Sequence, residues 1–111
     1  MGTWIEAPDV AVHVPAICDL ELTHTLRSLA RAQILPEPRA DQALALYLAL
    51  PLARHDHRAL LGRVWTLRSN FTPYDAAYVA LAEALRARLL TVDGGLARAI
   101  KQHTVVEVVG L

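Results

Sequence analysis

The C-terminal third of the sequence alternates between helical and extended patterns, and this alternation limits the fold more than any other feature. Thr72 followed by Pro73 is a strong helix start, because a hydroxyl can cap the first N–H groups and proline suits the first turn. Residues 88–93 form a short apolar strand, 96–102 a brief helix and 104–109 a second strand. Short connections between such elements favour parallel strands joined by crossover helices. The sequence therefore predicts an α/β fold.

The N-terminal part fits the same scheme. Residues 10–14 are mostly β-branched and predict a short strand. Apolar residues recur at near-helical spacing over 16–32 and again over 39–50. Residues 52–56 are expected to form a short edge strand, and 58–69 a further helix. The expected architecture is a three-layer α/β fold in which crossover helices cover a parallel sheet.

Length and composition predict one domain with its own core. The chain has 111 residues, of which 54% are hydrophobic and 20% charged, so a single domain over 1–111 is expected. No run approaches the ~18 apolar residues of a membrane span, and the first residues lack a secretory signal pattern. The single cysteine, Cys18, excludes an internal disulfide and fits a reducing compartment. We therefore expect a cytoplasmic protein without a membrane segment.

Charge composition argues against non-specific binding of nucleic acid, because the formal net charge is zero. The cations are ten arginines and one lysine, a bias that suits bidentate contacts with phosphate but that a GC-rich genome produces equally well. Arg27, Arg31, Arg68 and Arg98 are each consistent with an RNA contact or with a solvated surface. The two tryptophans, at positions 4 and 65, are too few and too scattered to predict a stacking platform.

Three carboxylates are expected at one edge of the predicted sheet. Ligands of open parallel sheets bind beyond the carboxyl ends of the strands, where Asp93 follows a strand. Asp75 lies in the first turn of a crossover helix, and Glu21 near the start of the helix after strand 10–14, so both face that edge. Three neighbouring carboxylates repel one another unless a hard cation such as Mg²⁺ or Mn²⁺ neutralises them. The chemistry that such an ion supports is phosphodiester hydrolysis.

Each of these carboxylates also has a structural explanation. Asp75 in a first helical turn suits the helix dipole, and Asp93 before two glycines is a common turn residue. Glu21 can be an ordinary solvated helix residue. Other candidate sites are weaker, because His55 and His57 lack a third zinc ligand and no phosphate-binding glycine loop supports a nucleotide-binding domain. The residues alone leave the metal-site and structural interpretations open.

Two stretches resemble PIN-domain ribonucleases of the VapC toxin type. Residues 72–99, TPYDAAYVALAEALRARLLTVDGGLARA, are similar to the family's C-terminal signature, a YDAxYVALAE helix followed by a strand that ends in T-x-D. Residues 15–29, PAICDLELTHTLRSL, are similar to the family's P-x-x-x-x-x-E helix, whose glutamate belongs to the metal site. The resemblance extends over nearly the whole chain.

The resemblance implies a function and a set of site residues. The acidic metal site of the family falls on Glu21, Asp75 and Asp93, and Thr91 matches the small hydroxyl residue beside the last aspartate. The implied activity is that of a Mg²⁺-dependent (or Mn²⁺-dependent) endoribonuclease toxin of a type II toxin–antitoxin system. Its implied substrate is structured RNA of the tRNA or rRNA class. The implied partners are a cognate antitoxin and a second copy of the chain in a homodimer.

This chain departs from the family at one place. The first strand of VapC-type toxins carries an aspartate in a V-x-D-[AST]-S-like pattern. The first fifteen residues of this chain align after that strand and its helix, so this N-terminal unit of about 25 residues is missing from the match. Asp9 precedes strand 10–14, at the opposite edge, and Asp19 lies about 200° round its helix from Glu21, so neither replaces the aspartate.

The missing strand lies centrally in the family's sheet, so its neighbours would expose unpaired backbone. Three outcomes remain open at this point: the sheet closes over the gap, a second chain supplies the pairing, or the chain as given starts late. An alternative function follows from the same departure. The chain could be a catalytically inactive remnant that keeps antitoxin-binding or dimerisation surfaces.

Overall fold

A computed structural model describes residues 2–9 and 11–111. The chain forms two compact units. Residues 17–51 form the first, here called the helical unit, and residues 2–16 and 52–111 form the second, here called the sheet unit, with residue 10 outside the described part. Among the helices of the described residues, none is both long enough and apolar enough to cross a bilayer.

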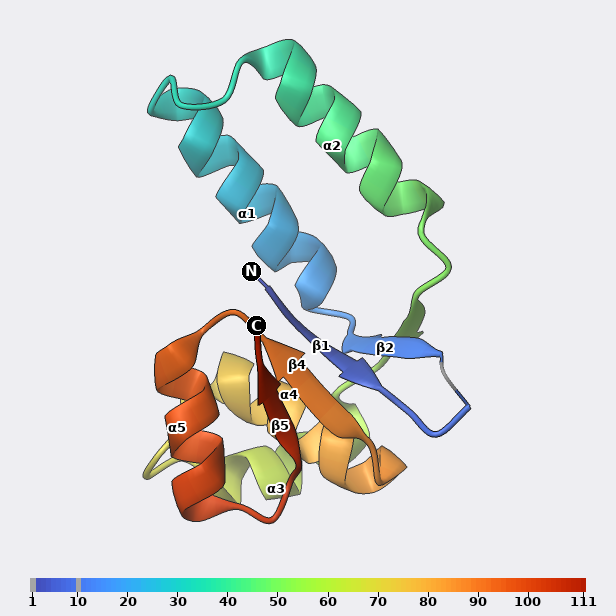
Figure 1. The fold of residues 1–111 in the computed structure, drawn as a ribbon, viewed down its shortest axis with the longest axis vertical. Coiled ribbons are helices and arrows are strands. Elements are labelled where there is room, and N and C mark those ends of the chain that lie inside the picture. Colours follow the sequence, from blue (N-terminus) through green and yellow to red (C-terminus); the bar gives the residue numbers. More distant parts are fainter. Residues whose placement is uncertain (1, 10) are drawn as a thin grey trace. The chain divides into compact units, whose positions relative to one another are not determined.

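The helical unit consists of α1 (Cys18–Arg31) and α2 (Glu37–Ala49) (Figure 1). Both helices were predicted, with bounds within two residues of those expected. Pro36 is the N-cap of α2, and a second proline lies in its first turn, so the prolines that end the first helical pattern also begin the second. The hydroxyl of Tyr47, on α2, donates to Asp19 Oδ1 at 2.7 Å and to Cys18 Sγ at 3.5 Å. These contacts tie the last part of α2 to the first turn of α1.

Within its described residues, the sheet unit contains five strands. Their bounds are β1 (Thr3–Glu6), β2 (Val12–Pro15), β3 (Ala53–His55), β4 (Arg88–Thr91) and β5 (Val108–Gly110). Their order across the sheet is β3-β2-β1-β4-β5. The pairs β2–β3 and β4–β5 are parallel, whereas β1 is antiparallel to both β2 and β4. The α/β class is confirmed, and β3 is the edge strand that the sequence predicts, but the sheet is mixed rather than wholly parallel.

Strand β1 was not predicted, and it occupies the central position that the family comparison left empty. Figure 1 shows it between β2 and β4. Thr3 pairs with Thr91 on one side, and Ile5 pairs with His13 on the other. The gap is therefore closed from within this chain, by residues that run in the opposite direction to their neighbours. The strand expected from residue 10 begins at Val12, and residue 10 itself lies outside the described residues.

The helices of the sheet unit are the 3₁₀ turn η1 (Arg58–Leu60), α3 (Leu61–Thr66), α4 (Pro73–Leu85) and α5 (Gly94–His103). Helix α4 packs against β1, β2 and β4, and its residues 76–82 are all buried. Ile5, Val79 and Leu89 each have no exposed surface and form the centre of this packing. The core of the sheet unit is therefore built around β1, β4 and α4.

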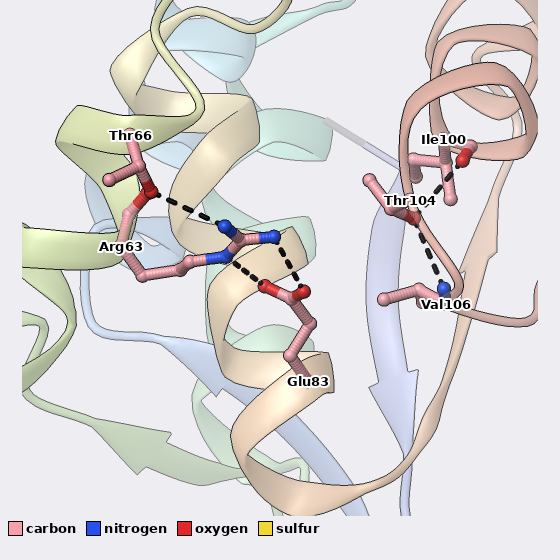
Figure 2. Close-up of polar contacts among 6 residues, drawn as sticks. All are labelled: Arg63, Thr66, Glu83, Ile100, Thr104 and Val106. Atoms are coloured by element: carbon pink, nitrogen blue, oxygen red, sulfur yellow. Dashed lines mark hydrogen bonds and ion pairs between the residues drawn. The ribbon is translucent and has the colours of Figure 1, made fainter.

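Two polar contacts hold the outer elements in place, as Figure 2 shows. Arg63 of α3 donates to both carboxylate oxygens of Glu83 on α4, at 2.8 and 2.9 Å. After α5, the hydroxyl of Thr104 donates to the carbonyl of Ile100 at 3.0 Å and accepts from Val106 N at 3.1 Å. This hydroxyl ends the helix and turns the chain, so the last strand starts at 108 rather than at 104 as predicted.

Replacing Ile5 by alanine tests the central position of β1. Ile5 is fully buried, so Ile5→Ala should lower the free energy of unfolding by about 2–5 kcal/mol, the usual range for emptying an aliphatic core site. Val105→Ala is the matched control, because Val105 is 97% exposed and its truncation should change stability by less than about 0.5 kcal/mol. Urea unfolding measures both. Equal midpoints for the two variants would show that β1 is not a core strand.

Candidate active site

The candidate site lies at one edge of the sheet unit, which is defined by strand direction. Because β2 and β4 are both antiparallel to β1, they are parallel to each other and to their outer partners β3 and β5. The carboxyl ends of these four strands therefore share one edge, and β1 begins there. Thr3, the first residue of β1, pairs at this edge with Thr91, the last residue of β4.

A buried hydroxyl organises the end of β4. Thr91 has no exposed surface, and its Oγ1 lies 2.8 Å from Thr3 Oγ1 and accepts from Asp93 N at 3.0 Å. The backbone repeats the link, since Val92 N donates to Gly2 O at 2.9 Å. Gly2 has a φ of +130°, and a Cβ there would lie 2.3 Å from Val92 Cγ2, so this close approach requires glycine. These contacts hold the start of β1 against the segment of residues 91–93.

Asp93 is the N-cap of α5 rather than the turn residue that the sequence suggests. Its Oδ1 accepts from Leu96 N at 3.0 Å, and Gly94 and Gly95 form the first helical turn instead of a separate turn. The Asp93 side chain is exposed at the sheet edge. The guanidinium of Arg98 lies over the same turn, where a Cβ at Gly94 would meet Nη1 at 3.5 Å. A carboxylate and a cation therefore share the beginning of this helix.

Asp75 lies in the first turn of α4, as predicted. Thr72 is the N-cap, and its hydroxyl accepts from Asp75 N at 3.1 Å. The C-terminal end of α4 leads through a connection of residues 86–87 into the start of β4. The N-terminus of α4 consequently points toward the opposite end of β4, which is the edge that carries Asp93. Asp75 is half-buried. Asp75 and Asp93 are therefore on the same edge of the sheet unit, each at a helix N-terminus.

Glu21 lies in the first turn of α1 and belongs to the helical unit. Its backbone N–H donates to Ile17 O at 3.0 Å, and its side chain is half-buried. Asp19, in the same turn, accepts the hydroxyl proton of Tyr47 and so serves the packing of α1 on α2. The role of Asp19 is thus structural within its own unit.

Carboxylate oxygens are the ligands that hard divalent cations prefer, so the chemistry of Asp75, Asp93 and Glu21 suits Mg²⁺ or Mn²⁺. Within residues 2–9 and 11–111, however, no three His, Cys, Asp or Glu side chains are grouped so that they could hold a metal ion. Thr3 is the site residue that the sequence does not reveal. Its hydroxyl lies beside that of Thr91, and only recognition of β1 would have found it.

Two histidines on the neighbouring strands β2 and β3 contact each other, His13 as the second residue of β2 and His55 as the last residue of β3. His13 Nδ1 lies 2.7 Å from His55 Nε2, with the ring planes inclined by 37°. One nitrogen donates and the other accepts, so at least one ring of this pair is neutral. Burial, and secondly the proximity of His13, lower the pKa of His55 below its ordinary value. Asp9 Oδ1 lies 3.8 Å from His13 Nε2, a nitrogen that has no hydrogen-bond partner among the described residues. His57 is exposed.

The histidine pair should make stability depend on pH. Because the folded chain lowers the pKa of His55, the unfolded chain binds that proton more readily. The stabilisation is therefore complete above about pH 6.5, the ordinary histidine pKa, and declines as the pH falls below it. Urea midpoints between about pH 7.5 and pH 5.5 should show this decline, and His55→Gln should flatten it. His57→Gln, at an exposed histidine, should keep the wild-type slope, and equal slopes for all three proteins would refute the account.

Comparison with known proteins gives several relatives, although no protein-family model matches the chain. Ribonuclease VapC9 of Mycobacterium tuberculosis is 40% identical over 82 residues, which are 74% of this chain and 65% of that protein. Ribonuclease VapC12 of the same species is 35% identical over 98 residues, 88% of this chain and 76% of that protein. Ribonuclease VapC1 of Mycobacterium tuberculosis is 44% identical in an alignment 91 residues long that covers 78% of this chain and 66% of that protein. The chain thus spans slightly less than two thirds of the length of VapC9.

Proposed function

The chain belongs to the VapC-type family of PIN-domain proteins, and we propose on this premise that it is an endoribonuclease toxin of a type II toxin–antitoxin system. One observation carries the proposal. The match to VapC12 covers 98 of the 111 residues, and any segment of that length contains Glu21, Asp75 and Asp93. The similarity therefore includes all three candidate site residues rather than a peripheral part of the chain.

The proposed cofactor is Mg²⁺, or Mn²⁺ in its place. Asp75 and Asp93 of the sheet unit are its proposed ligands, and family membership implies Glu21 of the helical unit as a third. When bound, such an ion activates water for attack on a phosphodiester and stabilises the charge that develops on the phosphate. The protein's own contribution is orientation. Asp93 is fixed by its cap on α5 and by the Thr91 hydroxyl, and Asp75 by the Thr72 cap on α4. Both carboxylates stand at helix N-termini, where the helix dipole favours negative charge.

The proposed substrate is structured RNA of the tRNA or rRNA class, and the proposed compartment is the cytoplasm. Arg98 supports an anionic substrate, since its guanidinium lies over the same helical turn that Asp93 caps. The proposed partners are a cognate antitoxin and a second copy of the chain. The antitoxin would cover the acidic edge, which is the edge of the sheet unit that carries Asp75 and Asp93. These partners are inferred from family membership.

A second candidate function is that of an inactive module that keeps the antitoxin-binding or dimerisation surfaces. The observation that favours it is the identity of Thr3. At the edge where β1 meets β4, this chain places a hydroxyl rather than a carboxylate. A hydroxyl contributes no negative charge toward a divalent cation, so metal affinity should be lower than with an aspartate at that place. Both candidates predict binding of an antitoxin, and they differ in metal binding and RNA cleavage.

Metal binding is tested by titrating Mn²⁺ into the protein in a calorimeter. If Asp93 is a ligand, Asp93→Asn should weaken Mn²⁺ binding by on the order of tenfold, because one charged oxygen ligand is lost. Asp41→Asn is the matched control, since Asp41 is exposed on α2, away from the first turn of any helix that carries a proposed ligand. Identical isotherms for wild type and Asp93→Asn would refute the assignment of this ligand.

RNA cleavage distinguishes the two candidate functions. Because Thr3 supplies no charge, the proposed ribonuclease should cleave bulk tRNA only weakly in Mg²⁺, whereas the inactive module should not cleave it at all. Thr3→Asp adds a carboxylate at the same edge and should raise the cleavage rate by on the order of tenfold. Thr3→Asn, with nearly the same shape and no charge, should not do so. Asp75→Asn added to Thr3→Asp should abolish the gain, and a gain that survives this change would contradict the proposed site.

A further inference from the structure

Trp65 is a large aromatic side chain on α3 that lies mostly in solvent. It is 66% exposed, and the guanidinium carbon of Arg68 lies 4.3 Å from the centroid of its ring. Arg68 Nη1 also donates to the backbone carbonyl of Trp65 at 2.9 Å, which holds the guanidinium near the ring. An indole beside a guanidinium combines a flat π surface with a fixed positive charge.

The orientation of Trp65 is fixed by the opposite side of α3. Val64 and Leu67 are buried, at 8% and 7% exposure, and Arg63 is paired with Glu83 of α4 (Figure 2). Because these contacts hold the inner face of α3 on the core, Trp65 cannot turn inward without breaking them. Its exposure is therefore a property of the fold and not of a loosely attached helix.

The position of this pair relates it to the candidate site. The chain runs from Arg63, which is held beside the C-terminal half of α4, to Thr72, which caps the N-terminus of the same helix. Trp65 and Arg68 lie between these points in the sequence, and α3 packs against α4. Asp75 is in the first turn that Thr72 caps. A single RNA strand would have to extend from Asp75 to the indole to contact both.

We propose that Trp65 and Arg68 form an accessory RNA contact, in which one unpaired base stacks on the indole and Arg68 binds a neighbouring phosphate. The inference rests on the proposed ribonuclease function. Aromatic stacking suits RNA because every base has a π face, and an arginine guanidinium binds phosphate oxygens while it remains against an aromatic ring. The formal net charge of zero supplies no overall attraction for RNA, so RNA binding by this chain would depend on local contacts of this kind.

A protein partner fits this surface less well. Within α3, whose residues 61–66 are all described, the large apolar side chains that are exposed are Leu61, at 50%, and Trp65. A stable protein interface usually needs 20–30 residues per partner, at about 800 Å² a side, and α3 supplies two of the apolar ones. A single base, by contrast, needs one aromatic face and one cation, which is what the pair offers.

The test is fluorescence of Trp65 during titration with a single-stranded oligoribonucleotide of about twelve nucleotides, within the usual site sizes for such contacts. The titration is done in EDTA, so that no cleavage occurs. Trp65 is made the sole indole by the substitution Trp4→Phe, because the chain has two tryptophans. Stacking should quench the emission of Trp65 in a saturable manner. Trp65→Ala should weaken binding of the same RNA about tenfold, the loss expected for one stacked base, with the affinity of this variant measured by the fluorescence anisotropy of end-labelled RNA.

Two further variants make the result specific. Trp65→Phe keeps a smaller ring and should bind RNA more tightly than Trp65→Ala does. A role of this exposed residue in folding alone would not predict that difference. Leu61→Ala removes the apolar neighbour on the same helix and should leave RNA affinity within about twofold, because it removes no stacking face. Circular dichroism and thermal melting check that each variant remains folded.

Three outcomes would overturn the inference. RNA binding with unchanged Trp65 emission, and with equal affinity for Trp65→Ala, would remove this contact and leave the proposed ribonuclease function standing. Emission that changes with protein concentration but not with RNA would assign the surface to contact between copies of the chain. If no variant binds RNA, and the Thr3→Asp protein does not cleave it, the proposed function fails together with this inference.

Discussion

The backbone pairing of β1 with both β2 and β4 is the constraint on which the sheet unit depends. Strands β2 and β4 run parallel, yet they are not hydrogen-bonded to each other, and without β1 each would present an unpaired edge inside the sheet. Residues 3–6 fill that place in the antiparallel direction and bury Ile5 against α4. Because β1 is reversed, its first residue rather than its last lies at the carboxyl edge. The direction of one short strand therefore decides which side chain the centre of the sheet brings to the candidate site.

The two aspartates at that edge lie at helix N-termini, and metal binding by them is the proposed function. Asp93 caps α5, and Asp75 stands three residues after the Thr72 cap of α4, so each carboxylate has a structural role that is compatible with a functional one. Thr91 connects the start of β1 with the start of α5, since its hydroxyl contacts both Thr3 and the backbone of Asp93. The proposed nuclease chemistry adds to these roles and replaces none of them.

Much of the fold could be predicted from the sequence because periodicity and capping are local. The helix after Thr72 and the strand from Arg88 were recognised from such signals, as was the short strand at Ala53. Strand β1 was missed because four residues, TWIE, carry too little pattern, and its stability comes from pairing with β4, which is far away in the sequence. Two glycines after Asp93 are typical of a turn, but here they form the first turn of α5, with Asp93 as its N-cap. The Thr3–Thr91 contact depends on β1 and was therefore beyond local patterns.

Amide hydrogen exchange measures the central claim most directly, because it reports the hydrogen bonding of individual backbone groups. If β1 is the central strand, the amides of Trp4 and Ile5 should exchange as slowly as that of Leu89 in β4 and far more slowly than that of the exposed Val105. Exchange of the β1 amides at the rate of Val105, while Leu89 stays protected, would contradict the account. In that case the sheet would lack its central pairing, and Thr3 would have no defined place at the acidic edge.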